Sequence, residues 1–378
     1  MPTTMSRRIF AGRLGLAAGA ALLETPLARP VEAAAARTPG PADAIRLNAN
    51  ENPYGPSPRA LEAFGQAGRV AGRYPDALEE EMRAAIARHH RVVPEQVVLG
   101  CGSSEILQMA DEAFAGPGRP VVAAEPTFEA VLSYARAIRA EGVKVPLAPD
   151  FRHDLPKMAA AAAAGAGLVY VCNPNNPTGT IVGGDELAAF AERVPASTTI
   201  VVDEAYHHFV ENPSYRSALE LVAKHPNVVV ARTFSKIYGM AGLRLGYAVG
   251  AKERIEAMSR FASFSNANAG VLAAALASLA DPDLVPRQRK LLNETRRWLV
   301  GEMARQGRRT MPSETNFLMI DVGGDVKPVI QDFRERNILV GRKFPSLPTW
   351  LRVTVGKPEE VRAFAAALQE IVPVKAAA

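Results

Sequence analysis

Lys236 stands in a sequence context that favours chemistry. Thr233 and Ser235 precede it, Gly239 follows it, and Arg244 comes eight residues later. Hydroxyl groups and an arginine around one lysine can hold a phosphate, and the arginine can bind two oxygens at once. Burial and Arg244 should depress the pKa of the lysine, and a neutral lysine condenses with aldehydes. The pattern therefore predicts a phosphorylated aldehyde cofactor attached to Lys236, with a solvated surface lysine as the alternative.

Asp203 and Tyr206 could act on the ring of such a cofactor. Asp203 ends an apolar run that begins at Thr198. A carboxylate at the end of a buried strand is costly unless a cationic group lies against it, and a protonated pyridine nitrogen is such a group. That pairing would make the ring an electron sink, while Tyr206 could donate its hydroxyl to a ring oxygen. The alternative is an aspartate that caps the following helix.

Two further loops carry polar groups that suit the same cofactor. Residues 172–179 are crowded with Asn and Pro, which is typical of a rigid turn, and Asn176 could supply a second donor to the ring oxygen. Gly102, Ser103 and Ser104 follow another apolar run and open a helix, where free N–H groups and hydroxyls can bind an anion. Each loop taken alone also fits a tight turn or an ordinary helix cap.

All four motifs follow short apolar runs rich in Val and Ile, which favour strands buried on both faces. These runs are Val97–Leu99, Pro120–Ala124, Leu168–Cys172, Thr198–Val202, Val228–Ala231 and Leu245–Val249. Helical patterns alternate with them at Leu78–Arg91, Ser103–Phe114, Glu129–Glu141, Leu155–Ala164, Asp185–Arg193 and Ser217–Lys224. This alternation predicts an α/β fold with a mostly parallel sheet. Ligands bind at the carboxyl edge of such sheets, so the four motifs should meet there.

The C-terminal part has a different pattern, which predicts a smaller α+β domain. Its expected elements are helices at Pro286–Gln306, Pro328–Arg336 and Pro358–Ile371 and strands at Asn316–Asp321 and Trp350–Val355. Residues 45–73 are rich in Asn, Pro and Gly, and they are expected to lie outside any sheet. The predicted organisation is an arm at 37–75 that joins the small domain, a large domain at 76–270 and a small domain at 271–378.

Residues 1–36 have the three parts of an export signal. Arg7 and Arg8 are followed by Phe10, an apolar stretch runs from 14 to 23, and small residues occupy 33–36. The arginine pair resembles a twin-arginine motif, and the apolar stretch is too short for a permanent bilayer anchor. The sequence therefore predicts export to the periplasm by the twin-arginine route without a stable membrane anchor. A cytoplasmic protein with an accidental arginine pair is the alternative.

Composition argues against several other classes. The chain has 378 residues, of which 48% are hydrophobic and 22% charged, as in a globular protein of two domains. The net charge is +5 without a block of Lys and Arg, which argues against nucleic-acid binding. The pairs His89-His90 and His207-His208 lack a nearby carboxylate cluster, so no metal site is predicted.

Together these motifs resemble those of a known family. From residue 45 to 372 the chain is similar to the fold type I aminotransferases of class I/II, which use pyridoxal 5'-phosphate (PLP), and within them to the histidinol-phosphate aminotransferase branch. The resemblance is carried by residues 50–56, 73–76, 102–105, 126–128, 173–179, 203–206, 233–244 and 350–356. It implies an aspartate-aminotransferase-like fold, in which a large domain with a seven-stranded, mostly parallel sheet is joined to a smaller α+β domain.

The resemblance implies a role for each matching residue. Lys236 resembles the lysine that holds PLP as a Schiff base and moves the α-proton of the substrate. Asp203 resembles the pyridinium partner, and Tyr206 and Asn176 resemble the donors to the ring oxygen. Phe128 resembles the aromatic ring stacked on the cofactor. The residues that resemble the phosphate cup are Gly102, Ser103, Thr233, Ser235 and Arg244.

The resemblance also implies substrate and subunit contacts. Arg352 resembles the arginine that binds the substrate α-carboxylate, with Asn176 beside it, and Tyr54 resembles a gate over the substrate pocket. Arg342 is expected to face the pocket for the substrate side chain. Tyr74 resembles the residue that reaches the phosphate of the neighbouring subunit, which implies a homodimer with shared active sites.

One departure from the branch concerns the substrate. An arginine commonly follows the Ile-Leu-Val stretch directly, whereas this chain has Gly341 there and Arg342 one residue later. This departure weakens the case for a phosphorylated substrate. The predicted reaction is the transfer of an amino group between an amino acid, or a related amine, and a 2-oxo acid. Another PLP reaction on the same scaffold (a lyase, decarboxylase or cyclase) and a non-catalytic cofactor-bound sensor are the alternatives.

Overall fold

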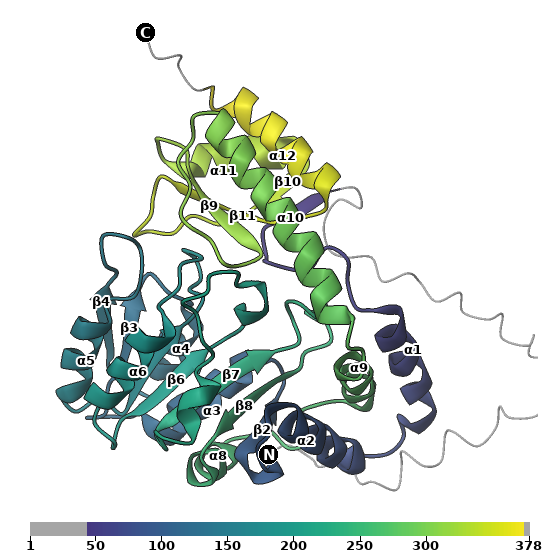
Figure 1. Ribbon diagram of the computed structural model, residues 1–378, viewed down its shortest axis with the longest axis vertical. Helices are drawn as coiled ribbons and strands as arrows, with labels where there is room; N and C mark the ends of the chain where they lie inside the picture. Colours follow the sequence, from purple (N-terminus) through teal and green to yellow (C-terminus); the bar gives the residue numbers. More distant parts are fainter. Residues whose placement is uncertain (1–43, 374–378) are drawn as a thin grey trace, which may run out of the picture. The chain divides into compact units, whose positions relative to one another are not determined.

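A computed structural model describes residues 44–373, so the predicted signal at 1–36 lies outside the described residues. A seven-stranded sheet has the strand order β2-β8-β7-β6-β5-β3-β4 (Figure 1). β8 is antiparallel to both of its neighbours, and the other pairs are parallel. The strands are β2 (Val97–Gly100), β3 (Val121–Glu125), β4 (Gly142–Pro146), β5 (Leu168–Cys172), β6 (Thr199–Asp203), β7 (Val228–Thr233) and β8 (Gly246–Gly250). The predicted α/β fold is confirmed.

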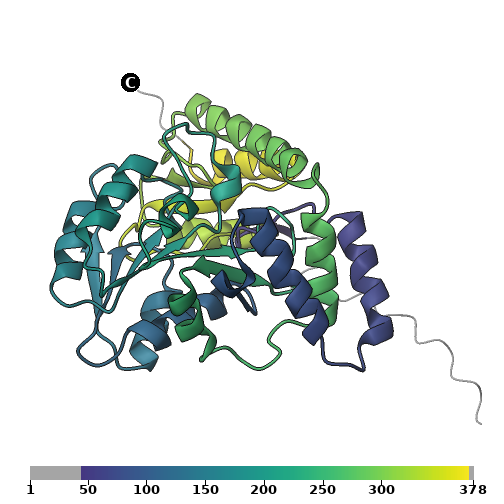
Figure 2. The same cartoon turned by 60° about the horizontal axis from the view of Figure 1, so that its bottom comes forward.

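Helices cover both faces of this sheet (Figure 2). Val121 and Val201 pack on one face with α3, α4 and α8, while Val122 and Val202 pack on the other with α5, α6 and α7. Successive strand residues point to opposite faces, so two covered faces require the continuous apolar runs seen in the sequence. The helices before the small lobe are α1 (Pro58–Ala67), α2 (Asp76–His90), α3 (Ser103–Phe114), α4 (Ala130–Ala137), α5 (Leu155–Ala163), α6 (Gly184–Arg193), α7 (Leu219–Val222), α8 (Lys252–Ser259) and α9 (Ala269–Leu279).

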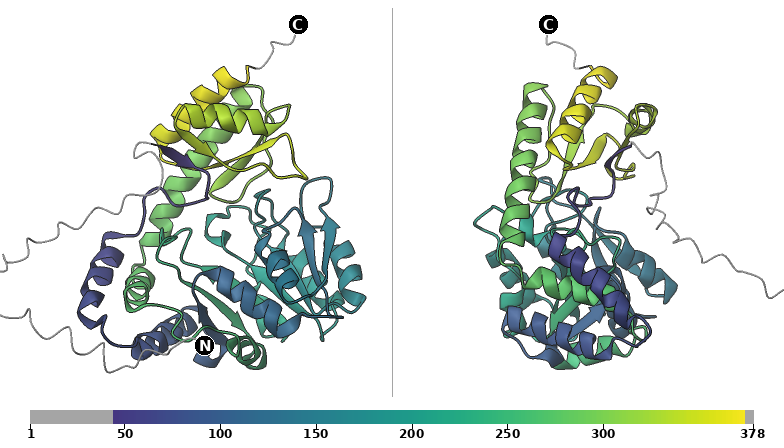
Figure 3. Two further views of the ribbon diagram at one scale, coloured as in Figure 1. Left: turned by 180° about the vertical axis from the view of Figure 1, so that it is seen from behind. Right: turned by 90° about the vertical axis from the view of Figure 1, so that its right-hand side faces the viewer.

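A smaller lobe combines the C-terminal part with the start of the described chain. β9 (Phe317–Asp321) and β11 (Trp350–Thr354) are antiparallel, and β1 (Ile45–Leu47) pairs in parallel with β10 (Ile338–Val340). Its helices are α10 (Leu284–Arg305), α11 (Val326–Glu335) and α12 (Pro358–Ile371). Figure 3 shows β1, in purple, among the green and yellow elements of this lobe. Because the chain runs from β1 to the large lobe, residues 48–54 lie at the junction of the two lobes.

Some predicted elements differ from the observed ones. The prediction that residues 45–73 lie outside any sheet is wrong, because they contain β1 as well as α1. β1 has only three residues, which is too short for an alternating pattern to show. The helix predicted at 129–141 ends at Ala137 and is followed by β4, and the helix predicted at 217–224 is the four-residue α7. Helices α8 and α9 were not predicted.

No single helix within residues 44–373 is long and apolar enough to cross a membrane; α9 and α10 meet those criteria only as a pair bent by 84°.

Candidate active site

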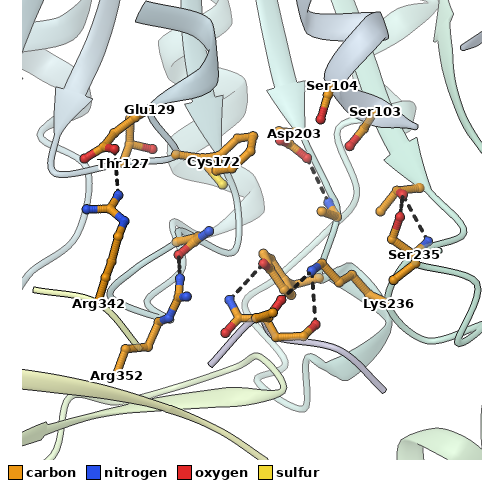
Figure 4. A pocket seen from close by; sticks show the side chains of 18 of the residues that line it. Ser103, Ser104, Thr127, Glu129, Cys172, Asp203, Ser235, Lys236, Arg342 and Arg352 are labelled. Atoms are coloured by element: carbon orange, nitrogen blue, oxygen red, sulfur yellow. Dashed lines mark hydrogen bonds and ion pairs between the residues drawn. The ribbon is translucent and has the colours of Figure 1, made fainter. Parts of the chain in front are cut away.

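Five loops of the large lobe meet at the carboxyl edge of its sheet, as expected for a parallel sheet. They follow β2, β3, β5, β6 and β7 and surround a cavity of about 300 Å³. The N-terminal segment, residues 48–54, and the small lobe close the cavity from the other side (Figure 4). Most residues singled out from the sequence line this cavity: Ser103, Ser104, Phe128, Asn176, Asp203, Tyr206, Thr233, Ser235, Lys236, Arg244, Arg342 and Arg352. The structure therefore brings them together.

One end of the cavity is rich in hydrogen-bond donors. The hydroxyl of Thr233 donates to that of Ser235 at 2.9 Å, and Nη1 of Arg244 donates to Ser235 Oγ at 3.3 Å. Ser103 begins helix α3, whose first N–H groups have no partner within the helix. Gly102 has a φ of +79°, and a Cβ there would overlap Nη2 of Arg244. Hydroxyls, a guanidinium and a helix N-terminus form a cup for an anion such as phosphate.

Lys236 occupies the middle of the cavity. Its Nζ donates to the carbonyl oxygen of Asn50 at 3.0 Å and lies 5.4 Å from the centre of the Tyr206 ring. Burial lowers the pKa of Lys236 to about 8, and the positive charge of Arg352 adds to this effect. The predicted depression is confirmed, although Arg352 contributes more to it than Arg244 does. With a pKa of about 8, roughly a tenth of Lys236 is neutral at pH 7.

Asp203 is a buried carboxylate, and its negative charge is stabilised by neutral hydrogen-bond donors. Only 3% of it is exposed, Oδ1 accepts the N–H of Ala205 at 3.0 Å, and Oδ2 accepts the hydroxyl of Tyr170 at 2.9 Å. Burial outweighs these hydrogen bonds and raises the pKa of Asp203 to about 6. Because both donors are neutral, a cation bound in the cavity would relieve the cost of burying this charge.

Arg352 lies at the opposite end from the anion cup. Its Nη1 donates to Oδ1 of Asn176 at 2.8 Å and its Nη2 to the carbonyl oxygen of Asn48 at 2.9 Å. Both partners are neutral, and the buried Nε has no hydrogen-bond partner among the described residues. Burial lowers the pKa of Arg352. A partly dehydrated guanidinium with a spare donor is suited to binding a carboxylate.

Arg342 also lines the cavity, but its charge is balanced. Its Nη2 donates to Oε2 of Glu129 at 2.6 Å, and its guanidinium lies 4.4 Å from the centre of the Phe344 ring. Both members of this ion pair are about half exposed (52% and 55%). Gly341 packs against the backbone of Arg352, where a Cβ would lie 2.7 Å from the carbonyl oxygen. The position before Arg342 therefore has no room for a second cation near Arg352.

Two sequence-predicted residues lie away from this cavity. Tyr54 is partly buried and packs against the hydrophobic core of the large lobe, so it does not line the cavity within one chain. Tyr74 is 83% exposed. The role expected for Tyr74 involves a neighbouring subunit, and it stays a prediction.

Other residues of the site were missed by sequence reasoning. Tyr170 lies in the middle of β5, where its hydroxyl was the only polar group in an apolar run. Asn50 lies in the segment 50–56 that carries the family resemblance, but nothing in its spacing pointed to Tyr206 or Lys236. Glu129 follows Phe128 directly and could have been considered as the partner of a cavity arginine.

The cavity fits PLP. The anion cup suits the phosphate, buried Asp203 suits a protonated ring nitrogen, and Lys236 has the depressed pKa that condensation with an aldehyde requires. Tyr206 and Asn176 line the same cavity and could donate to a ring oxygen. No cluster of His, Cys, Asp and Glu that could hold a metal ion is found within residues 44–373.

Comparisons with known proteins agree with this chemistry. The family described as aminotransferase class I and II matches residues 42–368. Histidinol-phosphate aminotransferase from Symbiobacterium thermophilum is 44% identical over 329 residues, which cover 86% of this chain and 90% of that protein.

Solved structures extend the likeness to the fold. Histidinol-phosphate aminotransferase from Sinorhizobium meliloti, in complex with pyridoxal-5'-phosphate, matches with a TM-score of 0.82 and 30% identity over 87% of this chain and 90% of that chain. Aspartate aminotransferase from Thermus thermophilus with maleate shares the fold, with a TM-score of 0.77 and 22% identity over 87% of this chain and 92% of that chain.

Proposed function

The chain belongs to the aminotransferase class I and II family, and we propose that its amino-group donor is an α-amino acid whose carboxylate binds Arg352. The enzyme is a PLP-dependent transaminase that passes the amino group to a 2-oxo acid. The observation that carries the choice of substrate is the unbalanced charge of Arg352, whose partners are neutral and whose Nε has no hydrogen-bond partner within residues 44–373. One unbalanced cation matches one carboxylate.

PLP, held by the anion cup and by Asp203, supplies an aldehyde carbon and a ring that accepts electrons. The chain's own residues supply the proton transfers and the orientation. Nζ of Lys236 takes the proton from the α-carbon of the substrate, because its depressed pKa leaves part of it neutral at neutral pH. Arg352 would hold the substrate carboxylate in the cavity that also contains Lys236, and such positioning contributes strongly to rate.

Asp203, Tyr206 and Asn176 set the charge of the ring. Asp203 would keep the ring nitrogen of bound PLP protonated, since its negative charge is stabilised more by a cation than by the neutral donors alone. Tyr206 and Asn176, which both line the cavity, would donate to the ring oxygen. Asn176 also accepts from Arg352, so one side chain links the substrate end of the cavity to the ring end.

A second candidate substrate is histidinol phosphate. The relatives from Symbiobacterium thermophilum and Sinorhizobium meliloti are histidinol-phosphate aminotransferases, and the identity to the first is 44%. A phosphate carries more charge than a carboxylate, so it would have to share Arg352 or displace Glu129 from Arg342. The half-exposed Glu129–Arg342 pair contributes only about 0–1 kcal/mol, which makes that displacement possible.

A half-reaction screen separates these substrates. The PLP form of the enzyme is mixed with glutamate, aromatic amino acids, histidine and histidinol phosphate, and conversion of the cofactor to its amino form is followed by absorbance. We expect α-amino acids to react and Arg352→Gln to raise their KM at least tenfold with a smaller change in kcat. A tenfold preference for histidinol phosphate over every α-amino acid would overturn the first proposal in favour of the second.

The same screen tests the reaction type. A transaminase accumulates the amino form of the cofactor and needs a 2-oxo acid to turn over again. A lyase, decarboxylase or cyclase would release product repeatedly without a 2-oxo acid. The requirement for an acceptor is therefore measured by omitting it.

A homodimer with shared active sites is part of the proposal. Large apolar side chains are exposed on the described chain at Phe64, Tyr74, Phe261 and Phe264, and Phe264 is fully exposed. Side chains of this kind gather where subunits meet. Light scattering of the purified protein should give twice the mass of one chain.

Export by the twin-arginine route remains a proposal that rests on residues 1–36, which are not described by the structure. It is tested by cell fractionation of the full chain and of the double variant Arg7→Lys, Arg8→Lys. Export is supported if the full chain is found in the periplasm and the double variant is not. Cytoplasmic enzyme in both cases would show that the arginine pair is accidental.

A further inference from the structure

Asn50 connects three parts of the active site from the N-terminal segment. It is 2% exposed, and its backbone is in the left-handed region with a φ of 54°, which asparagine tolerates better than most residues. Its carbonyl oxygen accepts Nζ of Lys236, and its side chain lies between Tyr206 and Thr354. One residue thus contacts the reactive lysine, the loop after β6 of the large lobe and β11 of the small lobe.

Thr354 determines which way the Asn50 amide faces. The backbone N–H of Asn50 donates to Oγ1 of Thr354 at 2.9 Å. The Thr354 hydroxyl then directs its own proton to Oδ1 of Asn50, at 3.3 Å. With Oδ1 used in this way, the NH₂ group of Asn50 is the one that faces Tyr206, 3.1 Å from its hydroxyl oxygen.

The amide in turn determines the direction of the Tyr206 hydroxyl. An NH₂ group can only donate, so the Tyr206 oxygen accepts from Asn50 and keeps its own proton for another partner. Tyr206 is 4% exposed and lines the cavity, so that proton is available to a ligand there. An acceptor in the place of the NH₂ group would instead draw the proton away from the cavity.

We propose that Asn50 and Thr354 are positioning residues that fix the Tyr206 hydroxyl as a hydrogen-bond donor to the ring oxygen of PLP. The hydrogen bonds run in one direction, from the backbone of Asn50 through Thr354 and the Asn50 amide to Tyr206. Thr354 lies two residues after Arg352 on the same strand, so β11 orients both the substrate arginine and the start of this chain. The inference rests on PLP as the cofactor and is independent of which substrate the enzyme uses.

Asn50→Asp is the most direct test, because it replaces the donor with an acceptor of nearly the same shape. The carboxylate accepts a hydrogen bond from the Tyr206 hydroxyl, so the ring oxygen loses that donor and becomes more basic. The bound cofactor then keeps its own proton to higher pH. We expect the midpoint of its pH-dependent absorbance change to rise by about one pH unit. This absorbance titration needs no substrate.

A double-mutant cycle separates this effect from the added negative charge. In a Tyr206→Phe background there is no hydroxyl to redirect. Asn50→Asp should therefore shift the midpoint there by on the order of half as much as in the native background, a difference of at least about 0.5 pH unit. Equal shifts in the two backgrounds would mean that the carboxylate acts through its charge or through the fold alone. That result would overturn the proposal.

Thr354→Val tests the first step without adding charge. Valine keeps the shape but cannot orient the Asn50 amide, so the midpoint should rise, whereas Thr354→Ser retains a hydroxyl and should restore it. A valine variant with an unchanged midpoint would contradict the role of Thr354.

Asn227→Asp is the matched control for burial. Asn227 is 5% exposed and donates to the carbonyl oxygen of Thr198 at 2.9 Å, at the end of the sheet away from the cavity. It should lower the melting temperature and leave the midpoint in place. If the proposed substrate is wrong, the half-reaction screen shows a different preferred amine, but the midpoints of these variants stay as expected. Failure of the substrate proposal is therefore distinguishable from failure of the proposed role of Asn50 and Thr354.

Discussion

At the scale of single residues, the chemistry depends on two groups whose pKa values move toward neutrality. Burial raises the pKa of Asp203 to about 6 and lowers that of Lys236 to about 8. Between these values Asp203 is charged while part of Lys236 is neutral, which is the pair of states that PLP chemistry requires. The hydrogen bond from Tyr170 keeps the pKa of Asp203 from rising further.

Tyr170→Phe should raise the pKa of Asp203. The variant removes a donor to the charged carboxylate and leaves the buried ring in place, so the protonated form gains relative stability. PLP binding requires the charged form. The association constant of the apoenzyme for PLP should fall at low pH. The midpoint of this fall, its acid limb, should move from near pH 6 to roughly one unit higher. Fluorescence titration of the apoenzyme with PLP across this pH range measures the limb.

Tyr134→Phe serves as the control for this prediction. Tyr134 lies in α4, and its ring packs against the same hydrophobic core as Tyr170. Its removal should leave the acid limb where it is. An acid limb that stays in place in Tyr170→Phe would show that the backbone N–H of Ala205 is enough to stabilise the carboxylate.

At the scale of elements, β10 and β11 hold Arg352 through the close approach of Gly341. A Cβ at residue 341 would lie 2.7 Å from the carbonyl oxygen and 2.9 Å from the Cβ of Arg352. Gly341→Ala should push Arg352 away from its position in the cavity. We expect KM for the amino acid to rise about tenfold, which corresponds to about 1.4 kcal/mol, with kcat falling less. Steady-state kinetics with a saturating 2-oxo acid measure both constants.

Gly301→Ala is the matched substitution in a helix of the same lobe. Gly301 lies in α10, and a Cβ there would meet no atom within 4 Å. Alanine in a helix interior is favoured over glycine by roughly 0.5–1 kcal/mol, so this variant should be slightly more stable and keep its KM. A raised KM in both variants would assign the effect to the lobe as a whole.

Helix α3 carries the phosphate cup at its first residue and a buried, unpaired acid further along. Asp111 is fully buried, and neither carboxyl oxygen has a hydrogen-bond partner among the described residues. Burial raises the pKa of Asp111 to about 8. Between about pH 4, where an unfolded aspartate ionises, and this value, the unfolded chain releases a proton that the folded chain keeps. The free energy of unfolding therefore falls as pH rises through this range.

Asp111→Asn should remove that pH dependence. The amide cannot ionise, so we expect the variant to be more stable than the native chain by about 1–3 kcal/mol at pH 8 and by little at pH 4. Thermal unfolding at several pH values measures the difference. Glu80→Gln, on the exposed side of α2, should change stability by less than about 0.5 kcal/mol at either pH. A constant difference across pH would contradict the ionisation of Asp111.

The elements also show how far sequence patterns reach. Continuous apolar runs predicted every strand of the large sheet except β4, because burial on both faces removes polar residues and leaves a strong signal. The amphipathic α10 and α12 were predicted for a similar reason. β1 was missed because three residues carry no period, and its pairing with β10 depends on contacts between distant parts of the chain.

The same limit applies to the site. Lys236, Asp203 and Arg244 stand out because a charged side chain after an apolar strand requires a partner. The contacts that orient them are not encoded in local spacing: Asn50 reaches Tyr206 across 156 residues, and Arg352 reaches Asn176 across 176. Such partners become visible only when the fold brings the segments together.

At the scale of the whole molecule, both lobes contribute to one active site. The small lobe supplies Arg352 and Arg342, and each reaches a residue of the large lobe, Asn176 and Glu129 respectively. The N-terminal segment lies between the lobes and accepts Nζ of Lys236 on the carbonyl of Asn50. A change in the position of the small lobe would therefore alter the binding of the substrate carboxylate and the surroundings of the reactive lysine together.

The proposed homodimer adds a further segment to each site. If Tyr74 reaches the phosphate in the neighbouring subunit, each active site takes Lys236 from one chain and Tyr74 from the other. Tyr74→Ala and Lys236→Ala then remove residues that come from different chains. A heterodimer of the two variants then has one site with both residues intact. Mixing them in equal amounts under exchange conditions should restore about a quarter of native activity, since half of randomly formed dimers are heterodimers with one intact site each.

The complementation is measured against each variant alone, whose activities set the baseline. Lys236→Ala should have no measurable turnover, and Tyr74→Ala should bind PLP about tenfold more weakly, so their sum lies well below a quarter of native activity at limiting PLP. Because Tyr74 is 83% exposed in a single chain, its removal has little to disturb within that chain. Activity that never exceeds the sum of the two variants would show that Tyr74 does not act across a subunit interface.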